Sequence, residues 1–439
     1  MLTFIGLLII GVIVWLLLTE KVSPIIALIL VPLIGALLAG FDVSQLKEFY
    51  SGGTKSVTQI VIMFMFSILF FGIMNDVGLF RPMIGGLIKL TRGNIVAVSV
   101  GTVLVSVVAQ LDGAGATTFL SVVPALLPLY KRLHMNPYLL FLLLTSSAGL
   151  INLLPRGGPI GRVASVLGAD VGELYKPLLT VQIIGVVFIL VLSLFLGVRE
   201  KRRIVRELGA LPAVADLIKP APLSEEEQKL ARPKLFWWNV LLFLAAMSLL
   251  FSGIFPPGYV FMLAATAALL LNYRSPQEQM ERIYAHAGGA VMMASIILAA
   301  GTFLGILKGA GMLDAISKDL VHILPDALLP YLHIAIGVLG IPLELVLSTD
   351  AYYFGLFPIV EQITSQAGVA PEAAGYAMLI GSIVGTFVTP LSPALWMGLG
   401  LGLAKLSMGK HIRYSFFWAW GLSLAILISS IAAGIVPLP

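Results

Sequence analysis

Two polar motifs interrupt long apolar stretches of this chain and decide how it folds: QLDGAGATT, residues 110–118, and LSTDAYY, residues 347–353. Around them, 59% of the 439 residues are hydrophobic and only 11% are charged, whereas a soluble domain carries about 25% charged residues. Apolar runs of about 20 residues recur from end to end, which is the pattern of a membrane protein with many helical spans. The sequence therefore predicts an all-α polytopic membrane protein.

The apolar runs give the predicted membrane spans. The first run is counted as a span and not as a cleavable signal peptide, because no Lys or Arg precedes it. The predicted spans are 2–18, 22–40, 56–77, 137–170, 178–198, 236–254, 258–273, 284–307, 372–404 and 414–436. Two further stretches, 94–130 and 327–362, are too long for one span and carry the polar motifs in their middle. We interpret them as re-entrant hairpins whose tips are those motifs.

The long polar segment 199–235 divides the chain into a first membrane half, 1–198, and a second, 236–439. Because basic loops remain in the cytoplasm, the many Lys and Arg residues of this segment predict that it is a cytoplasmic linker. We expect the protein itself to lie in the inner (plasma) membrane of the cell. With the linker inside, the hairpin at 94–130 opens to the cytoplasm and the hairpin at 327–362 opens to the outside. The net charge of +5 is thus a topology signal, and we expect no nucleic-acid partner.

The two halves resemble each other along their length. GIMNDVGLF, which begins at Gly72, matches GILKGAGML, which begins at Gly305, and Pro137 matches Pro371, with offsets of 233 and 234 residues. Each half contains five predicted spans and one hairpin with a broken helix. Because five is odd, the halves have opposite orientations, which is the inverted repeat of secondary transporters.

Four segments break the apolar pattern at membrane depth. Two are the hairpin tips, and the other two are NLLPRGGPIGR at 152–162 and TFVTPLSPALW at 386–396. Irregular backbone is tolerated there where it lines a cavity, and the helix N-termini that it creates attract anions. Hydroxyl, amide and guanidinium groups in these segments suit a small carboxylate anion. The alternatives are simple helix kinks and hydroxyls bonded to their own helix. The candidate substrate contacts are Thr117, Thr118, Asn152, Arg156, Gly157, Gly158, Arg162, Ser348, Thr349 and Ser392.

Asp112 and Asp350 are the candidates for coupling to a proton or another cation, because a carboxylate inside the membrane usually marks an ion pathway. Capping of a helix at each tip is the alternative. Glu344 is a weaker candidate in the second hairpin. Arg156 and Arg162 are expected to contact substrate, although an Arg can also extend to the membrane interface.

An enzyme is not expected. The chain has no Cys, its five His residues are scattered, and no HExxH motif is present. The sequence therefore predicts no cofactor, and no metal site is certain. Asp112 and Asp350 would contact a divalent cation if one were bound together with the substrate.

The motifs LDGAGATTFL, NLLPRGGPIGR, LSTDAYYFG and PLSPALWMGLG resemble the citrate–metal:proton symporter (CitMHS) family of the ion transporter superfamily, over nearly the whole chain. The resemblance implies two halves with scaffold and transport parts, an elevator-like motion and a homodimer. It also implies a tricarboxylate taken up with Mg²⁺ or Ca²⁺ and driven by protons.

Three residues depart from the family pattern. Ala114 replaces an Asp, Arg156 replaces a Trp and Thr349 replaces an Asn. Because a divalent cation prefers carboxylate oxygens, the loss of one carboxylate and the gain of one cation favour a free carboxylate substrate. We therefore predict a proton-coupled secondary transporter for a citrate-like di- or tricarboxylate. Sodium coupling, or an antiporter or oxyanion permease on the same fold, are the alternatives.

Overall fold

The computed structural model describes residues 2–18, 22–79, 82, 86, 90–91, 94–112, 115–208, 225–252, 254–323, 325, 327–347, 349–389, 392–400 and 406–438. Within these residues the regular structure is entirely helical. Five helical segments are long and apolar enough to cross a membrane: Val43–Asp76, Val171–Leu208, Pro233–Leu250, Pro276–Gly309 and Met408–Ala432. The predicted all-α, polytopic fold is confirmed.

The first half of the chain forms α1 (Leu2–Leu18), α2 (Pro24–Leu38), α3 (Val43–Asp76), α5 (Ile95–Ala109), η1 (Gln110–Asp112), α6 (Gly115–Arg132), α7 (Pro137–Ile151), α8 (Gly158–Leu167) and α9 (Val171–Leu208). Two of these helices are longer than predicted. α3 begins 13 residues before position 56, because the Asp42 side chain accepts from the Gln45 backbone and the Gln45 side chain accepts in return, a capping box. α9 continues ten residues into the predicted linker, where Arg203 pairs with Glu200 and Glu207.

The second half begins after α10 (Glu225–Leu230). Its elements are η2 (Pro233–Leu235), α11 (Phe236–Ser252), α12 (Pro257–Asn272), α13 (Pro276–Gly309), α14 (Met312–Ile323), η3 (Leu329–Tyr331), α15 (Leu332–Val338), α16 (Gly340–Glu344), η4 (Ala351–Leu356), α17 (Phe357–Gln366), α18 (Pro371–Ser382), η5 (Ile383–Phe387), α19 (Pro393–Gly400) and α20 (Met408–Ala432). α14 lies in a stretch where no span or hairpin was predicted.

α3 and α13 occupy equivalent places in the two halves. Each has 34 residues, and α13 begins 233 positions after α3, since 276 minus 43 is 233. The N-caps Asp42 and Ser275 both accept from a backbone N–H, and both helices end before a glycine with positive φ, Gly78 or Gly311. The offset seen in the sequence thus applies to whole structural units.

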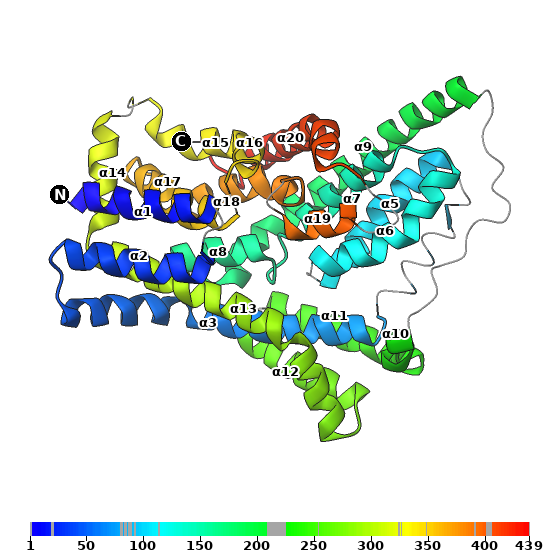
Figure 1. The fold of residues 1–439 in the computed structure, drawn as a ribbon, viewed down its shortest axis with the longest axis horizontal. Helices are drawn as coiled ribbons and strands as arrows, with labels where there is room; N and C mark the ends of the chain where they lie inside the picture. Colours follow the sequence, from blue (N-terminus) through cyan, green and yellow to red (C-terminus); the bar gives the residue numbers. More distant parts are fainter. Residues whose placement is uncertain are drawn as a thin grey trace.

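The same two helices pack tightly against each other in antiparallel orientation (Figure 1). A Cβ added to Gly53 would lie 2.8 Å from Cα of Gly305, so the two backbones touch there. At the other end, Gly72 of α3 lies against the His286 ring of α13. Because residue numbers rise along one helix while they fall along the other, α3 and α13 run in opposite directions.

In Figure 1, α5 and α6 of the first predicted hairpin lie on the right and α15, α16 and α17 of the second lie at the upper left, with α7 and α19 between them. α5 and α6 contact each other and are separated by η1, and the arm α15–α16 is separated from η4–α17 by residues 345–350. α7 stops at Ile151 and α8 resumes at Gly158, while α18 continues as η5 and α19 begins at Pro393. All four interruptions fall on the segments that the sequence singled out.

Candidate functional site

The four interrupted segments are brought together by contacts between the halves. α8 packs against α18 and η4, η5 packs against α7, and α19 packs against α6. At the first tip, a Cβ added to Gly115 would lie 2.6 Å from the Phe387 ring and 3.4 Å from the Ala394 side chain, near the break of the second half. The tip of each hairpin therefore lies against the broken helix of the other half.

Arg162 and Asp350 make the ion pair that joins the second tip to the first broken helix. Nε of Arg162 lies 2.7 Å from Oδ1 of Asp350, and the side chains are 12% and 14% exposed. The remaining guanidinium N–H groups of Arg162 carry no hydrogen bond to a described residue. Nη1 lies 2.6 Å from the place that a Cβ on Gly158 would take, beside the first turn of α8. An Arg presents five donors, so this one can hold Asp350 and an anion together.

Arg156 joins the first broken helix to the first tip. Its Nη2 donates to the backbone oxygens of Gln110, at 2.9 Å, and of Leu111, and its guanidinium lies 3.8 Å from the centroid of the Phe71 ring. The side chain is buried. Arg156 therefore holds the tip in place and adds a positive charge to it.

Gly157 and Gly158 form the start of α8. Gly157 is the N-cap, and a Cβ on it would lie 2.9 Å from the oxygen of Leu154, inside normal contact distance. Glycine at 157 thus lets the chain turn back closely before α8 begins. Asn152 is the C-cap of α7 and is buried. The first-turn N–H groups of α8 make a positively polarised end that suits an anion.

The other predicted residues are placed as follows. Thr118 is buried on α6 and donates to Oε1 of Gln110 at 2.6 Å. Ser392 precedes α19, and its hydroxyl accepts from the Leu395 N–H at 3.4 Å. Thr349 is half-buried beside Asp350. The side chains of Asp112, on η1, and Thr117, on α6, and the whole of Ser348 lie outside the described part of the structure. The roles of all of these residues in binding remain predictions.

The structure adds residues that sequence reasoning did not single out as a site. Gln110, at the first tip, is fully buried and holds both Thr118 and, through its backbone, Arg156. The six residues of η4 form a π-helix directly after Asp350, a deviation that is frequent at functional sites. A buried Gln at a polar tip is a signal that could have been used, whereas a π-helix leaves no recognisable mark in the sequence.

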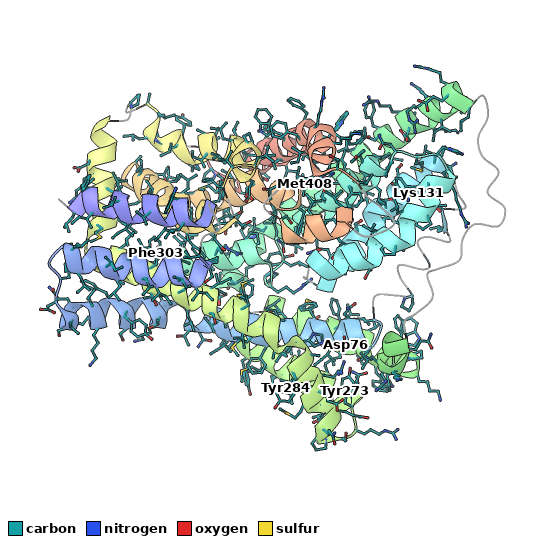
Figure 2. All side chains as sticks on the ribbon, viewed as in Figure 1. Asp76, Lys131, Tyr273, Tyr284, Phe303 and Met408 are labelled. Carbon is teal, nitrogen blue, oxygen red and sulfur yellow. The ribbon has the colours of Figure 1, made fainter. Side chains whose placement is uncertain are left out.

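A second charged cluster lies where α3 ends near the start of α13. The Asp76 carboxylate is 2.8 Å from Nε2 of His286 and 3.6 Å from Arg282. Figure 2 shows Asp76 close to Tyr273, the residue after α12, in the lower part of the molecule. This cluster ties α3 to α13. Among the described residues, no group of three or more His, Asp or Glu side chains could hold a metal ion.

Comparison with known proteins gives close relatives over the full chain. The profile of a family described as "Citrate transporter" matches residues 7–381. A protein named "Citrate transporter" from Bacillus subtilis is 36% identical over 99% of this chain and 100% of its own length. The "Mg(2+)/citrate complex secondary transporter" of the same organism is 34% identical over 99% of this chain and 98% of its own.

Solved structures show the same fold at low sequence identity. The YdaH transporter of Alcanivorax borkumensis superposes with a TM-score of 0.63 at 14% identity, covering 90% of each chain. MtrF of Neisseria gonorrhoeae, described as an antimetabolite efflux pump, gives 0.62 at 14% identity, covering 91% of this chain and 86% of its own. At this identity the likeness concerns the fold alone.

Proposed function

Because this chain belongs to the citrate transporter family, we propose that it carries citrate across the membrane by secondary transport coupled to protons. It is a multi-pass membrane transporter and not an enzyme. We further propose that it resides in the inner membrane of the cell as a homodimer, with residues 199–235 in the cytoplasm. The halves 1–198 and 236–439 would be inverted repeats that move substrate by an elevator-like motion, and the antiparallel α3 and α13 support this arrangement.

The observation that carries the proposal is the arrangement of Arg162 beside the N-terminus of α8. Nε is held by Asp350, and Nη1 lies beside Gly158 in the first turn of α8. A guanidinium fork and backbone N–H groups are the donors that carboxylates prefer. A citrate carboxylate would bind Arg162 and this turn, while Thr118, Ser392 and Thr349 lie on the surrounding segments.

We propose that the substrate is citrate without a metal ion. The Asp350 carboxylate is already paired with Arg162, Ala114 supplies no ligand at the first tip, and Arg156 places a positive charge on that tip. A divalent cation at the same place would be repelled by Arg156 and would have one carboxylate ligand fewer than the family pattern offers. The second candidate is the complex of citrate with Mg²⁺, which the relative named a Mg²⁺/citrate transporter favours.

Uptake of labelled citrate into proteoliposomes tests both candidates. An imposed pH gradient, acidic on the side from which citrate enters, should drive accumulation, and EDTA should leave it unchanged. Uptake that requires Mg²⁺ would support the second candidate, and uptake that follows only a Na⁺ gradient would exclude proton coupling. Absence of citrate uptake in the presence of either gradient would refute the proposed function.

A further inference from the structure

Glu344, the last residue of α16, has a fully buried carboxyl group without a hydrogen-bond partner among the described residues. Its exposed fraction is 0%, and neither carboxylate oxygen has a hydrogen bond to any residue that the structure describes. A charged carboxylate without a partner in such surroundings is very costly, which favours the neutral, protonated form. Glu344 is therefore a candidate proton site close to the tip of the second hairpin.

The packing around Glu344 explains why water does not reach it. Gly340 lies against the backbone of α18, where an added Cβ would come within 2.7 Å of the Ser382 nitrogen. An added Cβ on Gly385 of η5 would meet the Ile341 side chain at 2.7 Å and the Glu344 Cβ at 3.5 Å. The hydroxyl of Thr386, next to Gly385, is also buried without a partner among the described residues. Two polar groups without partners thus occur on two elements in contact, α16 and η5.

Glu344 is electrostatically linked to the ion pair of the candidate site. The charged groups that interact with it electrostatically are Arg162 and Asp350, and its own charge would act on the phenols of Tyr352 and Tyr353 on η4. As far as they are described, α15, α18, η5 and α20 add no charged group to this set. While Arg162 is paired with Asp350, their charges largely cancel, and Glu344 receives little compensation for a charge of its own.

We propose that Glu344 carries the proton that is transported with the substrate, an inference that rests on the proposed function. When an anion binds Arg162, negative charge is added near Glu344, and the carboxylate binds its proton more strongly. By reciprocity, a protonated Glu344 strengthens the binding of the anion. The anion and the proton therefore bind and leave together, which is what symport requires.

Glu361 provides a matched control in the same hairpin. It lies on α17, its side chain is also buried, and it accepts a hydrogen bond from Ser365 at 3.1 Å. Glu344→Gln removes the titratable group while it preserves shape, and Glu361→Gln does the same at a carboxylate that has a partner. The two variants separate the loss of a proton site from the loss of any buried carboxylate.

Two transport assays in proteoliposomes test the proposal. The first measures accumulation of labelled citrate driven by a pH gradient, together with the proton entry that accompanies it, and the second measures citrate–citrate exchange at equal pH, which needs no net proton movement. Glu344→Gln should lose gradient-driven accumulation and proton entry but retain exchange, while Glu361→Gln should retain all three activities. Accumulation by Glu344→Gln at the wild-type level would overturn the proposal, and so would loss of exchange in correctly inserted protein.

Infrared spectroscopy gives a readout that does not depend on the substrate. The purified wild-type protein should show the C=O stretching band of a buried protonated carboxylic acid, which Glu344→Gln abolishes and Glu361→Gln preserves. If this band is present but the wild-type protein moves no citrate, the proposed function fails and the proton site stands. If the band is absent at neutral pH, or if Na⁺ removes it, the proton site is refuted.

Discussion

Removal of the charge on Asp350 should destabilise the protein strongly, and removal of both charges should not. Nε of Arg162 and Oδ1 of Asp350 are 2.7 Å apart, and both side chains are under 15% exposed. Two unit charges about 4 Å apart interact by about 4 kcal/mol at an effective dielectric of about 20. Breaking a buried pair by removal of one partner costs about 3–5 kcal/mol, because the other charge remains buried.

For Asp350→Asn we therefore expect the free energy of unfolding to fall by about 3 kcal/mol, and by a similar amount for Arg162→Gln. In the double variant neither charge of the pair remains, so most of the stability should return. Two single losses of about 3 kcal/mol and a much smaller double loss give a coupling energy of about 4–6 kcal/mol, above the usual range of about 0.5–3 kcal/mol for residues in direct contact. Citrate transport should stay absent in all three variants, because the guanidinium that binds the anion and the carboxylate that positions it are needed together.

Unfolding in mixed micelles, followed by tryptophan fluorescence, measures these free energies, and citrate uptake is measured on the same preparations. Asp76→Asn is the matched control, since Asp76 is 15% exposed, pairs with Arg282 at 3.6 Å and His286 at 2.8 Å, and contacts neither Arg162 nor Asp350. It should lower stability but retain citrate transport. Additive losses in the double variant would show that Arg162 and Asp350 are not coupled, and restored transport there would refute their role in binding.

Other substitutions test further parts of the argument. Gly157→Ala should reduce transport and destabilise the protein by about 1–3 kcal/mol, because its Cβ would press on the chain before α8, and uptake together with unfolding measures both effects. The pair Ala114→Asp and Arg156→Trp restores the family residues, and it should make citrate uptake dependent on Mg²⁺ in an EDTA titration. Gly53→Leu should separate α3 from α13 and lower the melting temperature in detergent, while a leucine at the open position Gly52 should not.

The tips and the broken helices could be predicted because polar residues, Gly and Pro stand out within apolar sequence. The start of α3 could not be seen in the same way, since residues 43–55 are largely polar and a hydropathy window begins later. The capping pair Asp42 and Gln45 was the available signal. α14 was missed for a related reason, because a helix of 12 residues is too short to appear as a span.

Partners within the site were beyond sequence reasoning. Arg162 and Asp350 are 188 residues apart, and nothing local in either motif indicates the other. Arg156 was expected to contact substrate, yet its guanidinium binds two backbone oxygens of the first tip and stacks on Phe71. Glu344 was a weaker candidate for coupling because the sequence does not fix its depth in the membrane. Only the packing of α16 on η5 shows that its carboxylate is enclosed.

The site is held together by links that cross between the halves. The second tip is bound to the first broken helix through Asp350 and Arg162, and Gly115 at the first tip lies against Phe387 in the second half. Neither hairpin can therefore move without disturbing the helix break of the other half. An anion bound to the remaining donors of Arg162 would share the guanidinium charge with Asp350 and so weaken the ion pair, the one charged link of the two. Substrate binding would in this way act on the second hairpin, the same element that buries Glu344, so that one contact governs both the anion and the proton.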